Sequence, residues 1–304
     1  MPTPSKPFDR RVVTLVTPVY KPELTPTEAI SLERALSVLA PYDHYLAAPQ
    51  GLNIEAYEAL FAKHGKQALV ARFSPASFSS VEAYSHMLTG AAFYRRFRKY
   101  RYLLIYQLDC YVFRDELLAW CARGYDYIGA PWFKGFDEAA ADGEFAGVGN
   151  GGFSLRRVSA ARRALMRYHL ARAWASTLGR WMRPFDPRAW SQHFLQNEDR
   201  FWGLTLGPRV PGFRLPSAED AIPFAFEVNP RRLFRMNGER LPFGCHACWR
   251  YDPAFWREFI PGAEQPVEEA HDYGGDGAPP SKTRRFRRVL EGAAPSAPRI
   301  STGC

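Results

Sequence analysis

A single carboxylate, Asp109, stands at a position where chemistry is expected. It ends the string Gln107-Leu108-Asp109, which follows the apolar and aromatic run Tyr102–Tyr106 directly. A run of this kind predicts a strand buried on both faces of a mostly parallel sheet. Ligands bind at the carboxyl ends of strands in open α/β sheets, so Asp109 is a candidate binding group. Asp also ends many strands as an ordinary turn residue, and this stretch alone supports both interpretations equally.

Three further stretches are candidates: a glycine loop, a pair of adjacent acids and a single histidine. They are Gly149-Asn150-Gly151-Gly152, Asn197-Glu198-Asp199 and His246. Glycines let the backbone approach a substrate closely, although a flexible turn would look the same. Acids at a helix start are usually caps or partners of the helix dipole, and less often proton acceptors. A lone histidine fits a metal ligand, a phosphate contact or a packed side chain.

Two familiar motifs match the sequence, but the surrounding residues that each motif requires are missing. Gly147, Gly149 and Gly152 satisfy G-x-G-x-x-G, but no hydrophobic strand precedes them and no acid lies about 20 residues further on. Cys245 and Cys248 form a C-x-x-C pair, but a structural zinc site needs a second ligand pair at matching spacing. We therefore expect neither a dinucleotide fingerprint nor a zinc centre.

Composition bounds the protein class. The 304 residues are 46% hydrophobic and 15% aromatic, which predicts a sizeable folded core. The sequence contains no run of 18 apolar residues, so no transmembrane helix is predicted. Met1–Arg11 lacks the apolar stretch of a secretory signal. Five cysteines are an odd and sparse set that suits a reducing compartment. These features predict a cytoplasmic protein, with contact at the inner membrane as a further expectation.

The formal net charge of +9 is concentrated in one part of the chain. Nine arginines stand against one acid between Leu155 and Arg188, whereas residues 263–304 hold six basic and six acidic side chains. The positive charge therefore belongs to the folded body. A basic surface attracts phosphates of any kind, in nucleic acid, anionic lipid or a nucleotide ligand.

Strands and helices are predicted to alternate over the first half of the chain. The expected strands are 12–17, 44–48, 68–73 and 102–106, and the expected helices are 27–39, 54–64, 81–97 and 115–123. This alternation predicts a doubly wound α/β sheet with right-handed crossovers.

The second half is predicted with less regularity. A short strand is expected at 125–132, a mobile loop at 134–149, a helix at 158–182 and a late strand at 224–228. Residues 11–262 are interpreted as one domain, and 263–304 as a disordered tail rich in Pro, Gly and Ala.

Taken in order, these features resemble glycosyltransferases of the GT-A type. Such enzymes carry a D-x-D motif after a central strand, a glycine-rich loop, an x-E-D motif and a C-terminal histidine. The longer strings around Tyr106–Asp109, Tyr125–Trp132 and Gly149–Arg156 are similar to a bacterial family catalogued as a domain of unknown function near these transferases. The resemblance covers roughly Arg11 to Pro261 and implies a GT-A-like mixed sheet flanked by helices.

The resemblance also implies roles for single residues. Asp109 and a neutral His246 would bind Mn²⁺ or Mg²⁺, and Asp199 would deprotonate the acceptor, with Glu198 beside it. The remaining implied residues lie around the donor: Thr17, Pro18, Tyr20, Gln107, Asn150, Gly151 and Gly152. The first acid of D-x-D is Gln107 here, and an amide binds a ribose hydroxyl well but a cation poorly. Metal dependence is therefore an open question at this point.

Three functions are compatible with the sequence. The leading hypothesis is a glycosyltransferase that uses a nucleotide-sugar donor, a UDP-sugar first, and a glycan or lipid-linked acceptor in surface polysaccharide synthesis. The alternative is a catalytically weak protein that binds anionic membrane or, with less support, nucleic acid through its basic face. The last is a glycoside hydrolase with Asp109 and Asp199 as its two carboxylates, which would have no need of a basic environment.

Overall fold

The computed structural model describes residues 11–178 and 197–262, which belong to one compact unit, Met1–Glu269. The predicted tail 263–304 and the last residues of the predicted helix 158–182 lie outside the described residues. Among the helices that are described, none combines the length and the apolar character that crossing a membrane requires.

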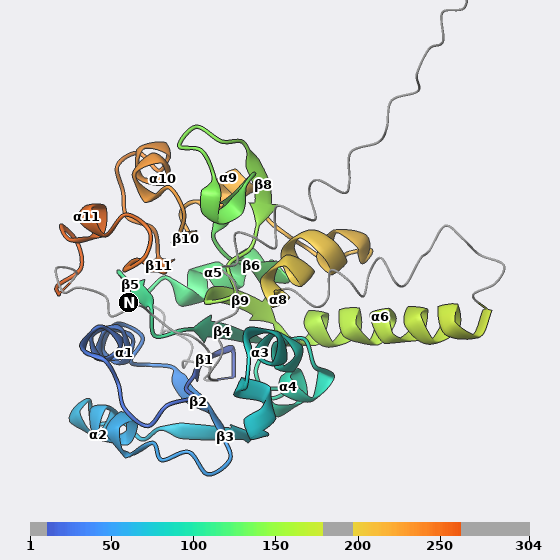
Figure 1. The fold of residues 1–304 in the computed structure, drawn as a ribbon, viewed down its shortest axis with the longest axis horizontal. Helices are drawn as coiled ribbons and strands as arrows, with labels where there is room; N and C mark the ends of the chain where they lie inside the picture. Colours follow the sequence, from blue (N-terminus) through green and yellow to red (C-terminus); the bar gives the residue numbers. More distant parts are fainter. Residues whose placement is uncertain (1–10, 179–196, 263–304) are drawn as a thin grey trace, which may run out of the picture. The chain divides into compact units, whose positions relative to one another are not determined.

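A six-stranded mixed sheet forms the centre of the described chain (Figure 1). Its strands, in spatial order, are β3 (Leu69–Phe73), β2 (Asp43–Pro49), β1 (Val13–Pro18), β4 (Tyr102–Tyr106), β9 (Phe153–Arg157) and β6 (Tyr127–Ile128). The first four run parallel, and β9 is antiparallel to both β4 and β6. The predicted α/β fold with a mixed sheet is confirmed.

The strand β4 is buried along its whole length, as its apolar run predicted. Leu104 and Tyr106 face one hydrophobic cluster, and Leu103 and Ile105 face another. The alternation arises because successive side chains of a strand point to opposite faces. Helices cover both faces, so no side of β4 meets water and its carboxyl end is held rigidly.

The helices flank the sheet in chain order. The larger ones are α1 (Pro26–Val38), α2 (Glu55–Lys63), α3 (Val81–Leu88), α4 (Ala91–Arg96), α5 (Leu117–Arg123), α6 (Val158–Leu178) and α10 (Pro230–Met236). The short ones are η1 (Pro75–Phe78), η2 (Phe136–Glu138), α8 (Glu198–Arg200), the π-helix η3 (Phe201–Leu206), η4 (Gly207–Arg209), α9 (Ala218–Ala221) and α11 (Pro253–Trp256).

Two sequence-based predictions of local structure were wrong. The single helix predicted over 81–97 is broken into α3 and α4 at Thr89-Gly90, where Gly90 leaves the helical region with ψ 136°. The apolar spacing continues across the break because both short helices pack on the same core cluster. The predicted loop 134–149 contains the strand β8 (Phe145–Val148), which pairs with β7 (Pro131–Phe133). The strand expected at 125–132 is thus divided between β6 and β7.

A small second sheet brings the C-terminal part of the chain to the end of β4. It consists of β10 (Ala225–Phe226), β11 (Gly244–His246) and β5 (Cys110–Val112). In the antiparallel pairing of β11 with β5, His246 is opposite Cys110, the residue after Asp109. This pairing is what carries the histidine to the carboxyl end of the central strand.

Candidate active site

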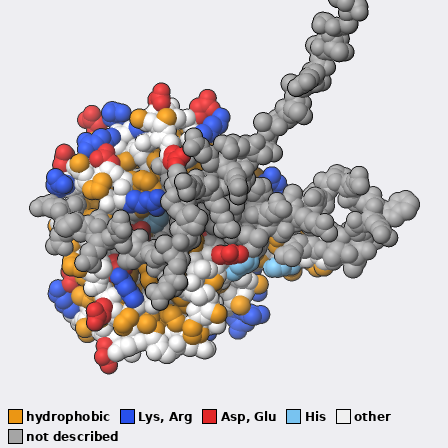
Figure 2. Space-filling model, in the orientation of Figure 1, with side chains coloured by type: hydrophobic (Ala, Val, Ile, Leu, Met, Phe, Trp, Pro, Cys, Tyr) orange, Lys and Arg blue, Asp and Glu red, His pale blue; other side chains and the backbone are white. Residues whose placement is uncertain are grey.

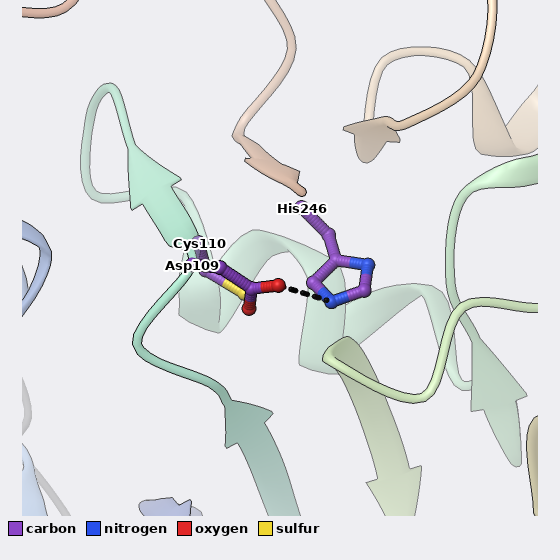
Figure 3. A group of neighbouring side chains, drawn as sticks. All are labelled: Asp109, Cys110 and His246. Atoms are coloured by element: carbon purple, nitrogen blue, oxygen red, sulfur yellow. Dashed lines mark ion pairs between the residues drawn. The ribbon is translucent and has the colours of Figure 1, made fainter. Parts of the chain in front are cut away.

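A carboxylate, an amide and an imidazole meet beyond the end of β4. The Nε2 atom of His246 lies 3.3 Å from Oδ2 of Asp109 (Figure 3) and 3.2 Å from Oε1 of Gln107. The amide nitrogen of Gln107 donates to the Tyr84 hydroxyl at 3.3 Å, which turns its oxygen toward His246. The side chain of Asp109 is 41% exposed, so this cluster is open to solvent on one side.

A second carboxylate binds the other side of the histidine ring. Glu227, directly after β10, lies 2.8 Å from Nδ1 of His246 through Oε1. Its Oε2 accepts a hydrogen bond from the indole of Trp132 at 3.1 Å. Glu227 was not among the residues predicted from the sequence, although it is a lone acid inside the apolar stretch Phe224–Val228.

The charge on His246 follows from these neighbours. Burial alone would lower the pKa of His246, but Asp109 and then Glu227 raise it well above the ordinary value. The imidazolium form is therefore favoured when only these side chains surround the ring. This differs from the neutral His246 expected of a metal ligand, which requires a cation in place of the Nε2 proton.

These residues fit a hard divalent cation. The carboxylate of Asp109 and the imidazole of His246 form an O/N donor pair that suits Mn²⁺ or Mg²⁺, and the amide oxygen of Gln107 is a weaker third donor beside them. Metal-binding histidines usually donate their second ring N–H to a carboxylate, the place that Glu227 occupies. Cys110 also lies in this group, but burial raises the pKa of its thiol and it donates to the Gly152 carbonyl. We therefore assign Cys110 to holding the glycine loop in place and not to binding a cation.

The glycine loop touches this cluster through one glycine. A Cβ atom on Gly152 would stand 2.1 Å from Nε2 of His246 and 2.8 Å from Oε1 of Gln107. Asn150, with φ 67°, accepts the N–H groups of Gly152 and Phe153 through its side-chain oxygen. The close approach that glycines permit is thus used here, and a larger residue would displace the histidine.

The neighbouring glycine touches the two adjacent acids. A Cβ on Gly151 would stand 2.0 Å from Oε1 of Glu198. The same carboxylate forms an ion pair of 2.9 Å with Arg156, and both side chains are almost completely buried. The guanidinium of Arg156 also donates to Ser154, Tyr94 and the Gly151 carbonyl. Arg156 therefore links the glycine loop, α4 and α8, a role that sequence reasoning did not foresee.

Asp199 lies beside this ion pair in a different environment. Its two carboxylate oxygens accept the backbone N–H groups of Gly151 at 3.2 Å and Arg200 at 2.8 Å. Burial, followed by the nearby charges of Glu198 and Glu227, raises the pKa of Asp199 to about 7. A carboxylate with this pKa can accept and release a proton near neutral pH.

Thr17, Pro18 and Tyr20, which were expected around the donor, lie in different environments at the end of β1. The register of β1 and β4 puts their carboxyl ends side by side, so Pro18 lies at the same sheet edge as Gln107. Tyr20 follows at the start of the next loop and is half-buried. Thr17 is fully buried, and its hydroxyl is 2.7 Å from Nε2 of His44, a ring that burial keeps neutral by lowering its pKa to about 3.

The fold and these side chains define an α/β protein with a carboxylate–imidazole cluster and an aspartate, Asp199, whose pKa is raised to about 7. The chain belongs to the family described as Protein of unknown function (DUF5672), whose model matches residues 67–246. No match was found among curated proteins.

Two solved structures are similar in fold. One is the galactosyltransferase LgtC in complex with donor and acceptor sugar analogues, with 14% sequence identity, a TM-score of 0.44, and coverage of 90% of this chain and 99% of that chain. The other is an active-site mutant of LgtC, with 16% identity, a TM-score of 0.46, and coverage of 94% and 97% respectively.

Proposed function

We propose that this protein is a glycosyltransferase that moves a sugar from a nucleotide-diphosphate donor to the hydroxyl of a glycan or lipid-linked acceptor. The observation that carries the proposal is the meeting of Asp109, Gln107 and His246 with the glycine loop and Asp199. Such a transfer needs groups that bind a diphosphate and a group that takes a proton. Candidates for both kinds of group lie against adjacent glycines of one loop, Gly151 and Gly152.

In this proposal Asp109 and His246 bind Mn²⁺ or Mg²⁺, and Gln107 contributes an amide oxygen to the cation or to the ribose. A divalent cation supplies Lewis-acid stabilisation of the charge on the leaving diphosphate. Glu227 orients His246 by accepting its Nδ1–H, and Trp132 fixes the second oxygen of Glu227. The sequence resemblance to GT-A enzymes supports the same ligand pair.

Asp199 is the proposed general base for the acceptor hydroxyl. Its raised pKa supports this role, because the base must be able to lose its proton near the working pH. Glu198 is held in the ion pair with Arg156, so we assign it to positioning rather than to proton transfer. A base-assisted single displacement inverts the anomeric carbon, and NMR of the product reads that configuration.

The donor is proposed to lie along the loop and the neighbouring strand end. Asn150, Gly151 and Gly152 border the sugar, while Pro18 and Tyr20 are near the base and ribose. The hydroxyl of Thr17 is occupied by His44, so we limit Thr17 to a backbone role. The acceptor pathway, surface polysaccharide synthesis in the cytoplasm, belongs to the same proposal.

Nucleotide binding tests the function directly. Thermal unfolding would be followed with UDP, GDP, dTDP, CDP and ADP, each with and without Mn²⁺. A ligand present at 100 times its Kd stabilises the folded state by about 2.7 kcal/mol. We expect this stabilisation for one base, UDP first, and a larger one when Mn²⁺ is present.

The variant Asp109→Ala should lose the Mn²⁺-dependent part of this stabilisation and keep its fold, because its side chain supports little of the core. The matched control is Glu58→Ala, which removes an exposed acid from α2. If no nucleoside diphosphate stabilises the wild-type protein under any condition, the transferase proposal is wrong. If Asp109→Ala retains the metal effect, the ligand assignment alone is wrong.

A further inference from the structure

The helix α6 has two faces of opposite character. Five buried residues of the helix pack in the cluster that also contains Phe201 and Leu206; they are Val158, Ala161, Ala164, Leu165 and Tyr168. The opposite face is exposed, and the C-terminal part of the helix projects beyond α3 and α4 (Figure 1). Packing in the core explains the apolar residues of the buried face, but it does not explain the residues of the exposed face.

The exposed face combines apolar and basic side chains in an ordered way. Met166 is 58% exposed and Leu170 is 61% exposed, and they are two of the four large hydrophobic residues exposed in the described chain. Successive helical residues are about 100° apart, so Met166 and Leu170 form the middle of this face. Arg162 and His169 lie along one side of them, and the remaining arginines of the face lie along the other side. Those are Arg163 and Arg167.

The charge of this face has a single sign. No Asp or Glu occurs anywhere between Val158 and Leu178, so none of its arginines has an acidic neighbour on the helix. Over the rest of the described surface that is visible in Figure 2, basic and acidic side chains are interspersed. Among the described helices of eight residues or more, α6 alone contains no acidic residue.

From this arrangement we propose that α6 lies in the plane of an anionic membrane surface, with Met166 and Leu170 inserted at the boundary between headgroups and acyl chains. Apolar residues flanked by arginines fit that boundary, because an arginine can bury its aliphatic stem and keep its charge among the phosphates. RNA would also attract the arginines, but it offers no apolar layer for the methionine and leucine. The membrane accounts for both kinds of side chain, independently of the proposed catalytic activity.

Vesicle co-sedimentation of the full chain tests the proposal. We expect binding to vesicles of phosphatidylglycerol and phosphatidylcholine at low ionic strength, weaker binding at high salt, and little binding to phosphatidylcholine alone. Absence of binding to the anionic vesicles, or equal binding to the neutral ones, would overturn it. Binding of single-stranded RNA without vesicle binding would overturn it as well and assign the face to nucleic acid.

Two variants separate α6 from every other basic segment of the chain. Arg162→Gln with Arg163→Gln should weaken the partition to anionic vesicles by roughly 25-fold, about fivefold for each arginine. Met166→Ser with Leu170→Ser should weaken it at high and low salt alike, because it removes the apolar insertion. The control pair, Arg235→Gln with Met236→Ser, changes an exposed arginine and an exposed methionine on α10.

The control pair should bind vesicles as the wild type does. All the changed residues are exposed, so far-UV circular dichroism and thermal unfolding should be unaltered in each variant. If both α6 variants bind as tightly as the wild type, another segment binds the membrane and the proposal is wrong.

Discussion

Two charged clusters touch adjacent glycines of one loop, and they balance their charges by different means. At Gly152, the carboxylates of Asp109 and Glu227 share the imidazole of His246. At Gly151, the carboxylate of Glu198 is paired with the guanidinium of Arg156. The first cluster is partly open to solvent, whereas the second is buried.

The two clusters differ in their cationic side chain, which is the imidazolium of His246 in one and the guanidinium of Arg156 in the other. An imidazolium can give up its proton, so in the proposed function a metal ion would take the place of that proton in the cluster at Gly152. A guanidinium keeps its charge at every accessible pH, so the cluster at Gly151 is a permanent support. Asp199, next to Glu198 but outside that ion pair, is the carboxylate of the second cluster whose raised pKa leaves it able to titrate.

The largest effect is expected from Asp199→Asn. This change keeps the size of the side chain and removes the proton acceptor, so turnover should fall by about 10²- to 10⁴-fold. Binding of the nucleoside diphosphate should persist, because the first cluster is intact. Steady-state kinetics and calorimetric titration measure the two quantities, and near-normal turnover would show that the base lies elsewhere.

Breaking the permanent ion pair should affect folding more than binding. Arg156→Met leaves Glu198 buried without its cation and should lower the free energy of unfolding by about 3–5 kcal/mol. Urea denaturation measures this loss. The double change Arg156→Met with Glu198→Gln removes both charges and should recover part of it. An equally unstable double variant would mean that Arg156 acts through its packing and its other hydrogen bonds, to Ser154, Tyr94 and the Gly151 carbonyl, and not through the ion pair.

A change in the cluster at Gly152 should alter the affinity for a metal ion. Glu227→Gln removes the carboxylate that orients His246 and should weaken Mn²⁺ binding by about 10- to 100-fold. Titration followed by electron paramagnetic resonance measures the affinity without any turnover. Glu219→Gln, an exposed acid on α9, is the matched control.

The two failures of this experiment can be told apart. A wild-type protein that binds no Mn²⁺ contradicts the metal-assisted mechanism. A wild-type protein that binds it, with Glu227→Gln binding equally well, contradicts only the role of Glu227.

The most gradual effect is a pH dependence of stability that Asp199 introduces over about three pH units. Its pKa is raised from 3.8 to about 7 on folding, so between these values the folded state binds more protons than the unfolded state. Asp199 therefore favours the folded state fully below pH 4, and this contribution is lost as pH rises to about 7. The slope is at most about 1.4 kcal/mol per pH unit.

Unfolding of the wild type and of Asp199→Asn across this range tests the sign. The free energy of unfolding of the wild type should fall relative to that of the variant as pH rises. Parallel curves would mean that Asp199 titrates at the ordinary value and is a poorer candidate for the base.

Elements whose signals are local could be predicted from the amino-acid sequence. The strand β4 was predicted with its observed bounds, because an uninterrupted apolar run between polar residues has few other solutions. Gly124 ends α5 in a left-handed conformation, which favours a glycine directly after the predicted helix 115–123. The short strands of the second half were less predictable, since β6 and β10 contain two residues each and have no period of their own.

Which charged side chains meet could not be predicted from the sequence, because it depends on how distant segments pack together. Glu227 lies 19 residues before His246, and the two come together because β10 pairs with β11. Arg156 looks in sequence like one of many arginines, but its place on the buried strand β9 directs it toward Glu198, 42 residues away. Sequence spacing carries no information on such distances. They are set by strand pairing and by the need of every buried charge for a partner.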